Sequence, residues 1–338
     1  MISDAGNLPG HKSTLLSVAP MMDRTDRHCR YFMRLLAPDV RLYTEMVVDQ
    51  ALLHGNAERL LRFDPREHPV ALQLGGSEPE ALASAAKLGE QRGYDEINLN
   101  IGCPSDRVQS GKFGACLMLE AAKVASCVAA IREVVDIPVT LKTRIGVDDH
   151  EDYDFLRDFV LTTAAAGCGM FIVHARKAIL AGLSPKENRT IPPLRYSTVY
   201  RLKREFPELR IVINGGIRDS RSVREHLGHV DGVMIGREAY SNPYWLVQLQ
   251  TEFLDDSGAA SVSREAVLAE MEAYASRETA GGERLSHITR HMLGLYAGQP
   301  GARNWRRYLS EAARGADAPA SAITRSLEAL NRSAQRFG

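Results

Sequence analysis

Short apolar segments alternate with stretches of helical periodicity along roughly the first 240 residues of the chain. Glycines such as Gly93 and Gly167 follow two of the helix-like stretches, where helix C-termini are expected. Eight strands alternating with helices are typical of a (β/α)8 TIM barrel, so we predict this α/β fold. A doubly wound sheet is disfavoured because no G-x-G-x-x-G motif follows the first segment. The predicted strands are 15–18, 40–46, 70–74, 96–100, 139–143, 171–174, 211–214 and 232–235.

The alternation ends after residue 254. The turn-rich sequence DDSGAASVS follows and indicates a linker. Helical periodicity then continues without another strand pattern. We therefore predict a barrel domain over 11–254, a linker over 255–262 and a small all-helical C-terminal domain over 263–338. The helices expected in this domain are 264–280, 289–297, 305–313 and 320–332.

The charge of the chain is balanced overall but uneven along its length. The 338 residues contain 42 Lys+Arg and 42 Asp+Glu, and 44% are hydrophobic, which is typical of globular proteins and excludes disordered or fibrous classes. From residue 284 to 338 there are nine arginines, no lysine and three acids, so this segment carries 9 − 3 = +6 and the preceding part −6. This asymmetry favours a polyanionic partner for the C-terminal domain.

Other compositional features indicate a cytoplasmic protein. No segment approaches the roughly 18 apolar residues that a membrane span requires, and the first fourteen residues lack the apolar core of a signal peptide. The five cysteines form an odd set without a C-x-x-C pair or zinc-type spacing. We therefore expect reduced thiols, no metal site and no membrane association.

Polar residues end the predicted strands, where TIM barrels carry their chemistry. Any one of them can simply cap its strand, but together they form one polar rim. Asn214-Gly215-Gly216 and Gly236-Arg237 follow the last two strands, where barrels commonly bind phosphate. The pattern favours a phosphorylated cofactor with a polar planar ring, such as flavin mononucleotide (FMN). The other strand ends are Pro20-Met21-Met22, Glu45, Gln73, Asn100, Lys142 and His174.

Three of these residues suit a flavin ring. Lys142 can hold negative charge on the reduced ring, and Gln73 can hydrogen-bond to the ring's polar edge. His174 can stabilise the anionic ring or contact the phosphate-bearing tail.

Cys103 is the one cysteine in an unusual setting. It follows a predicted strand in the run INLNIGCPSDRV, and its loop contains Gly111 and Gly114. Cys116, Cys127 and Cys168 lie in helix or core patterns and are expected to be inert. We predict that Cys103 is a nucleophile or a proton donor, and its position leaves both roles open.

The loop after the sixth predicted strand is unusually long and basic. Its sequence ARKAILAGLSPKENRTIPPL has about twenty residues, where two to six are typical. It contains Arg176, Lys177, Lys186 and Arg189 but only one acid, Glu187. This composition beside the rim favours contact with an anionic substrate.

Together, these motifs resemble the flavin-dependent tRNA-dihydrouridine synthases, and among them the bacterial A type. The resemblance covers roughly residues 15–311, and the block NIGCPSDRV is highly specific. Arg24 departs from the pattern, because this subfamily usually has tryptophan there. The matching segments are APMMDRTDRHCRYF, LYTEMV, VALQLGG, EINLNIGCPSDRVQSGKFGACLM, VTLKTRIG, FIVHARKA, LSPKENR, INGGI, DGVMIGREAY and HITRHMLGLYAGQPGARNWRRYLSE.

The resemblance implies specific roles. It makes Cys103 the proton donor and implies FMN contacts at Pro20, Met21, Met22, Gln73, Lys142, His174, Asn214, Gly215, Gly216, Gly236 and Arg237. It implies tRNA contacts at Asn100, Lys186, Arg189, Arg303 and Arg306.

The resemblance also implies a reaction. NADPH reduces FMN and leaves, the flavin N5 gives a hydride to C6 of the uracil, and Cys103 protonates C5. The uridine, at position 20 or 20a of the D-loop, must be extruded from the tRNA elbow. No obligate protein partner is implied.

Three other functions compete with this one. Another FMN-dependent barrel oxidoreductase can act on a free pyrimidine, with Cys103 as a base, but it leaves the basic tail unexplained. A Schiff-base aldolase can use Lys142, and it would be colourless. A non-catalytic RNA-binding barrel accounts for the arginines but not for the polar rim.

Overall fold

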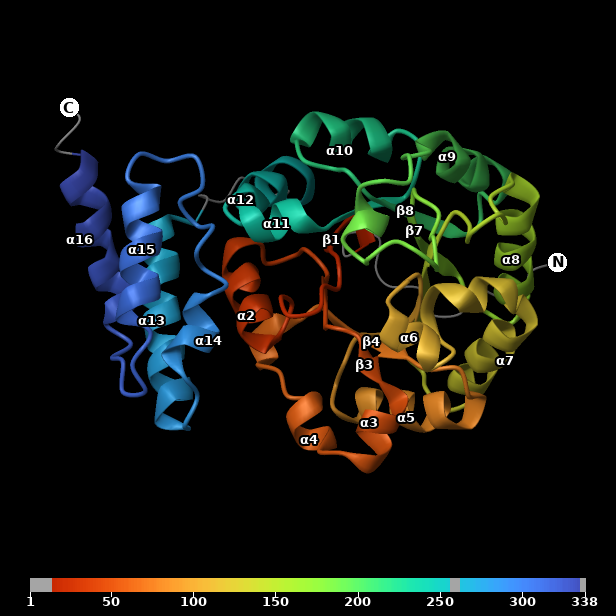
Figure 1. Ribbon diagram of the computed structural model, residues 1–338, viewed down its shortest axis with the longest axis horizontal. Coiled ribbons are helices and arrows are strands. Elements are labelled where there is room, and N and C mark those ends of the chain that lie inside the picture. The colour runs from red at the N-terminus through yellow and green to blue at the C-terminus, as the bar shows by residue number, and fades with distance from the viewer. Residues whose placement is uncertain (1–13, 256–261, 335–338) are drawn as a thin grey trace. The chain divides into compact units, whose positions relative to one another are not determined.

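The computed structural model describes residues 14–255 and 262–334 (Figure 1). Within these residues the chain forms two compact units. The first comprises residues 14–22 and 41–236, and the second comprises residues 23–40 together with everything described after 236. Most of the predicted linker, residues 256–261, lies outside the described residues, as do 11–13 and 335–338 at the ends of the predicted domains. The domain boundaries therefore stay predictions.

The first unit is built around a closed parallel sheet, which confirms the TIM barrel. Its nine strands follow the order β1-β9-β8-β7-β6-β5-β4-β2, with β3 also paired to β4. A parallel bridge between Ser17 and Arg41 joins the two ends of this order and closes the barrel. The strands are β1 (Leu16–Val18), β2 (Leu42–Tyr43), β3 (Val47–Val48), β4 (Val70–Gly75), β5 (Glu96–Ile101), β6 (Val139–Arg144), β7 (Met170–His174), β8 (Arg210–Asn214) and β9 (Gly232–Ile235).

The predicted strand 40–46 is only partly formed: β2 lies within it, and β3 begins just beyond its predicted end. Between them, the hydroxyl of Thr44 accepts the backbone N–H of Gln73 at 2.9 Å and donates to the carbonyl of Glu45 at 2.7 Å. A side chain thus takes a hydrogen bond that a strand carbonyl would otherwise accept. The ladder is interrupted at that point.

Helices surround the strands of the first unit (Figure 1). Two of them begin where an aspartate caps the first turn: Asp152 accepts the N–H of Phe155, and Asp219 accepts that of Ser222. The helices are α3 (Asp49–His54), α4 (Ala57–Leu60), α5 (Pro79–Gln91), α6 (Asp106–Ser110), α7 (Ala121–Arg132), α8 (Tyr153–Ala165), α9 (Tyr196–Glu205) and α10 (Ser220–Leu227), with short 3-10 turns η1 (Pro65–Glu67), η2 (Gly114–Leu119) and η3 (Glu187–Arg189).

The interior of the barrel is apolar on one side and polar on the other. The strands β2, β4, β7, β8 and β9, together with the residue that follows β1, contribute the buried cluster Ala19, Tyr43, Ala71, Met170, Ile172, Val212 and Met234. The strands β4, β5 and β6 add the buried polar residues Gln73, Glu96, Asn98 and Thr140 at inward positions. This polar sector leads toward the carboxyl ends of the strands.

The second unit is helical. Its core includes Tyr31 stacked on Tyr274, with ring centroids 3.9 Å apart, and Trp305, which is fully buried. The guanidinium of Arg24 lies 4.5 Å from the ring centroid of Tyr240, so a cation–π contact occupies the position where tryptophan is usual. The helices are α2 (Arg27–Leu36), α11 (Arg237–Ser241), α12 (Trp245–Leu249), the π-helical η4 (Gln250–Leu254), α13 (Arg264–Ala280), α14 (Leu285–Thr289), α15 (Ala302–Ala312) and α16 (Ala322–Ala334).

The helix predicted over 289–297 is wrong. Helix α14 ends at Thr289, and turns follow as far as Gly298. A Cβ at Gly294 would lie 2.6 Å from the carbonyl oxygen of Ser241, so the backbone passes too close there for a side chain. Gly298 has a φ of +75°, which ends any right-handed helical path. In the residues that the structure describes, no helix is long and apolar enough to cross a membrane.

Candidate active site at the carboxyl ends of the barrel strands

The loop that contains Cys103, which follows β5, is held by hydrogen bonds on both sides of this residue. The side-chain oxygen of Asn100, near the end of β5, accepts the backbone N–H groups of Gly102 at 3.1 Å and Cys103 at 2.9 Å. The carbonyl of Cys103 in turn accepts the N–H of Ala115 at 2.9 Å. The thiol is partly exposed and lies 3.5 Å from the hydroxyl of Ser105. The backbone of Cys103 is therefore fixed while its thiol can still reach a substrate.

Lys142 is a cation inside the barrel rim. Burial, and then the neighbouring charge of Arg144, lower the pKa of Lys142 to about 8. Its Nζ lies 3.4 Å from Oδ1 of Asn214 at the end of β8. Within the described part of the chain, no carboxylate pairs with Lys142. A site that holds such a cation favours a ligand that brings negative charge.

His174 ends β7 and is neutral at physiological pH. Burial lowers its pKa well below the ordinary value, and the cations Arg144, Lys142, Arg176 and Arg189 act in the same direction. The imidazole can therefore both donate and accept a hydrogen bond.

The Asn214-Gly215-Gly216 turn brings backbone close to the rim. Gly215 and Gly216 have φ values of +117° and +76°, which disfavour any residue with a side chain. A Cβ at Gly215 would lie 2.6 Å from the His174 ring. Tyr196 donates its hydroxyl to the carbonyl of Gly215 at 2.9 Å and so holds the turn. Such an open backbone fits the close approach of a phosphorylated group.

The remaining predicted cofactor residues follow three other strands. Gln73 on β4 is buried, whereas Pro20 and Met21 after β1 are partly exposed. Met22 is 55% exposed and so presents an apolar surface to solvent. Gly236 follows β9, where the nearest heavy atom to an added Cβ would be 3.9 Å away, and Arg237 begins α11. The predicted residues of the first unit thus gather at the carboxyl ends of its strands.

Arg144 is a central residue that the sequence analysis missed. Its Nε donates to the carbonyl of Gly102 at 2.8 Å, and one terminal nitrogen donates to the carbonyls of Lys177 and Asn188 at 3.0 Å each. It therefore ties the Cys103 loop to the long loop after β7. Burial lowers the pKa of Arg144 to about 10. The available signal was its spacing of two from Lys142, which places both side chains on the inward face of β6.

The long loop after β7 presents Lys186 and Arg189 to solvent on either side of the buried Asn188. The amide of Asn188 exchanges two hydrogen bonds of 2.8 Å with the backbone of Ile179. A buried amide therefore fixes the segment that displays the two cations.

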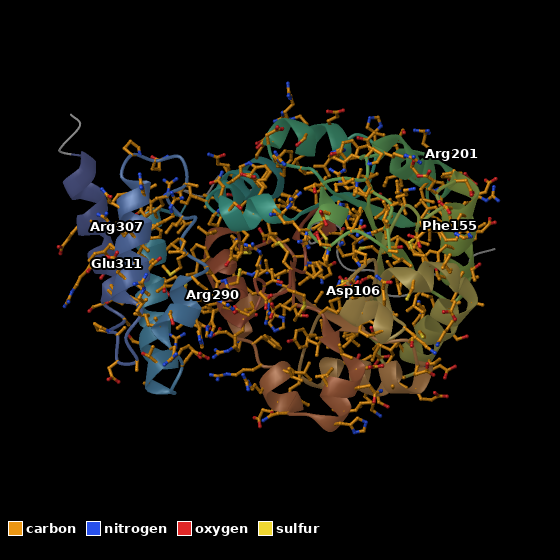
Figure 2. All side chains as sticks on the ribbon, viewed as in Figure 1. Asp106, Phe155, Arg201, Arg290, Arg307 and Glu311 are labelled. Carbon is orange, nitrogen blue, oxygen red and sulfur yellow. The ribbon has the colours of Figure 1, made fainter. Side chains whose placement is uncertain are left out.

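In the second unit, α15 has one apolar and one basic side. Trp305 and Leu309 are buried, whereas Arg303, Arg306 and Arg307 are exposed. Figure 2 shows Arg307 on this helix together with Glu311. No described carboxylate pairs with Arg303 or Arg306, so both guanidinium groups are available to an anion.

Known proteins are similar to this chain over most of its length. The model of the family dihydrouridine synthase (Dus) matches residues 17–335. A tRNA-dihydrouridine(20/20a) synthase of Escherichia coli is 58% identical over 319 residues, covering 94% of this chain and 92% of that protein. The protein of the same name from Shewanella oneidensis is 58% identical over 310 residues, covering 92% and 91%. The crystal structure of TcOYE with pHBA has a TM-score of 0.52 at 11% identity over 75% of this chain and 91% of that chain, and this supports the fold alone.

Proposed function

The chain belongs to the dihydrouridine synthase family and is thus an oxidoreductase that acts on tRNA, and we propose that it reduces the C5–C6 bond of uridine 20 or 20a in the D-loop. The observation that carries this proposal is the convergence of the fixed Cys103 loop, Lys142 and His174 on one end of a barrel. The position of the uridine rests on the names of the relatives.

The rim fits a flavin, and we propose FMN. The carboxylate-free cation Lys142 and the neutral His174 suit a ring that becomes anionic on reduction. The open backbone at Gly215 and Gly216 suits the phosphate. When bound and reduced by NADPH, FMN would supply the hydride that adds to C6 of uracil. The residues that would hold it are Pro20, Met21, Met22, Gln73, Lys142, His174, Asn214, Gly215, Gly216, Gly236 and Arg237.

Cys103 supplies the proton. Saturation of the C5–C6 bond needs one hydride at C6 and one proton at C5, and the partly exposed Sγ of Cys103 can donate that proton and be reprotonated from solvent. The side-chain oxygen of Asn100 accepts the backbone N–H of this residue, so the backbone that carries the thiol keeps its position through the transfer. Arg144 holds the preceding carbonyl, that of Gly102.

Exposed cations would hold the tRNA. Lys186 and Arg189 lie on the loop after β7, and Arg303 and Arg306 lie on α15. A stacked base hides both reacting carbons, so the uridine must leave its stack to react. Phosphate contacts from these side chains would hold the folded elbow meanwhile. All five cysteines are free thiols, which agrees with a cytoplasmic site of action, and the proposal requires no protein partner.

The test separates the two half-reactions of a Cys103→Ala variant. Purified wild-type protein should be yellow and should release FMN on denaturation. In the variant, NADPH should still reduce the flavin at the wild-type rate because that step needs no thiol. Dihydrouridine formation in unmodified tRNA should fall about a hundredfold or more, as expected for a lost general acid.

Cys116→Ala is the matched control, because that thiol is also partly exposed but donates a hydrogen bond to the carbonyl of Phe113 and is not among the predicted site residues. Its activity should be unchanged. A Cys103→Ala variant that modified saturating tRNA at the wild-type rate would remove Cys103 as the acid. Reduction of free uridine in preference to tRNA would favour the alternative of a free-pyrimidine oxidoreductase.

A further inference from the structure

A buried ion pair lies at the amino-terminal end of the polar sector inside the barrel. Glu96, the first residue of β5, is fully buried, and its Oε2 lies 3.2 Å from a terminal nitrogen of Arg41. Its Oε1 accepts the hydroxyl protons of Tyr43 at 2.9 Å and Thr140 at 2.6 Å. Burial raises the pKa of Glu96, and the charge of Arg41 opposes this by favouring the carboxylate.

A chain of side-chain hydrogen bonds runs from this carboxylate to the rim. Asn98 donates its Nδ2 to the hydroxyl oxygen of Thr140. Gln73 donates its Nε2 to Oδ1 of Asn98. Asn100 donates its Nδ2 to Oε1 of Gln73. Each distance is 2.8 Å. We call Thr140, Asn98, Gln73 and Asn100 the amide column.

Glu96 favours one direction for every bond in the amide column. A carboxylate only accepts, so the single hydroxyl proton of Thr140 goes to Glu96, and its oxygen is left to accept from the next residue. Asn and Gln have nearly the same shape when their amides are turned by 180°, so a neighbour must decide which end is the donor. Each amide of the column therefore points its nitrogen toward the neighbour that lies nearer to Glu96 and its oxygen toward the neighbour that lies farther away.

The other end of the column demands the same direction. The N–H groups of Gly102 and Cys103 can only donate, so Asn100 must turn its oxygen toward them. That oxygen then has both lone pairs occupied. What remains of the Asn100 amide for a substrate is an N–H of Nδ2. Asn100 therefore offers a uracil base a donor, which pairs with a ring carbonyl and not with the N3–H.

We propose that Glu96 is a positioning residue of the active site, which fixes through the amide column how Gln73 meets the cofactor and how Asn100 meets the base. This proposal rests on the proposed function, because it assumes that a flavin and a uridine occupy the rim. Glu96 itself lies at the opposite end of β5 and acts only through the column.

Substitutions at Thr140 test the amide column better than a substitution at Glu96. A Glu96→Gln variant would remove the carboxylate charge that faces the buried guanidinium of Arg41 at 3.2 Å, which endangers folding. Thr140→Val keeps the size and strand preference of the side chain but removes the hydroxyl, so Asn98 loses its acceptor. Thr140→Ser keeps the hydroxyl but removes the buried methyl group. A role in hydrogen bonding and a role in packing therefore predict opposite rankings of the two variants.

We expect Thr140→Val to bind FMN about tenfold more weakly than wild type, measured by titrating the apoprotein and following flavin fluorescence. Its kcat/KM for tRNA should fall as well, because a loosened Gln73 no longer holds the Nδ2 end of Asn100, although the bonds from Gly102 and Cys103 to the Asn100 oxygen remain. Thr140→Ser should stay within about twofold of wild type in both measurements. Thr143→Val is the control: this threonine is buried on the same strand but faces outward, and it makes only long bonds of 3.4–3.5 Å to backbone carbonyls.

The outcomes separate the two proposals. Strong FMN binding by wild type with equal affinities for Thr140→Val and Thr140→Ser, or weaker binding by the serine variant, would overturn the role of Glu96 and leave the proposed function standing. Wild-type protein that bound no FMN would overturn the proposed function and this role together. The expected ranking, with Thr143→Val equal to wild type, would support the column.

Discussion

Replacing Lys142 with methionine should stabilise the protein without its cofactor. The lysine carries a partly buried charge with no carboxylate partner among the described residues, and desolvation followed by Arg144 lowers its pKa from the ordinary 10.5 to about 8. Methionine has a similar length and no charge. The Lys142→Met variant therefore removes the electrostatic penalty and keeps most of the packing.

The size and sign of this stability change follow from the pKa values of Lys142 in the native and unfolded states. The native pKa of Lys142 lies about 2.5 below the unfolded one, which corresponds to a cost of about 3 kcal/mol in the free energy of unfolding at neutral pH. Below pH 8 both states are protonated and this cost is constant. Between pH 8 and 10.5 the unfolded state holds a proton that the native state has released, so wild-type stability rises with pH through that window. The lost 3.4 Å contact with Asn214 subtracts at most about 1 kcal/mol.

The assay is urea unfolding of the wild-type and Lys142→Met proteins without cofactor, from pH 6.5 to 10.5. The quantity compared is the difference between their free energies of unfolding at each pH. Lys142→Met should be more stable by about 2–3 kcal/mol at pH 7, and the gain should shrink toward zero by pH 10.5. Lys177→Met is the control, because Lys177 is paired with Glu151 at 3.3 Å and should show no such gain. A pH-independent difference, or a less stable Lys142→Met at pH 7, would refute the reasoning.

The same variant should lose function. Without the cation, binding of the reduced flavin should weaken by about 1.5–3 kcal/mol, the size of a lost charge-assisted hydrogen bond. Reduction of the remaining flavin by NADPH should slow accordingly, which stopped-flow absorbance would measure. A Lys142→Met variant that is more stable but less active would show that the charge of Lys142 serves function and not stability.

Three further predictions follow from other parts of the molecule. The double variant Arg303→Ala/Arg306→Ala should keep its flavin but bind tRNA weakly, with a salt slope reduced by about 0.7–0.9 per lost contact, and unchanged filter-binding curves across salt concentrations would argue against it. Gly215→Ala should lose FMN and at least about 1 kcal/mol of stability, because its φ is +117° and the new methyl would strike His174; normal flavin content after purification would contradict this. Arg144→Lys should make both attached loops sensitive to limited proteolysis, and protection equal to wild type would show that the guanidinium bonds are dispensable.

The sequence was a good guide to the barrel for a clear reason. Strands covered by helices bury both faces, so they form short apolar runs that are visible without any contact information. The break between β2 and β3 was not predictable, because it depends on a single hydroxyl, that of Thr44, which accepts a bond from a neighbouring strand. The failed helix over 289–297 depended on a tertiary contact at Gly294, which periodicity does not report.

The candidate site was partly predictable for a similar reason. Cys103, Lys142 and His174 stand at strand ends, where barrels place their chemistry. Glu96 stands at a strand start, and so its link to the rim could not be inferred from position alone. The alternation in EINLNI did contain a signal, since polar residues at every second position of a helix-covered strand must face the barrel interior. Its meaning depended on the register with β4 and β6.

Because one guanidinium holds both loops, their dynamics are linked. Opening the loop that contains Cys103 breaks the bond from Arg144 to Gly102, and opening the loop after β7 breaks the bonds to Lys177 and Asn188. Either event alone would leave a buried charge short of partners, so the low-energy route is for both to open as one cooperative unit. Amide hydrogens in the two segments would then exchange with solvent at a common rate. Release of a modified tRNA would wait for a single opening event.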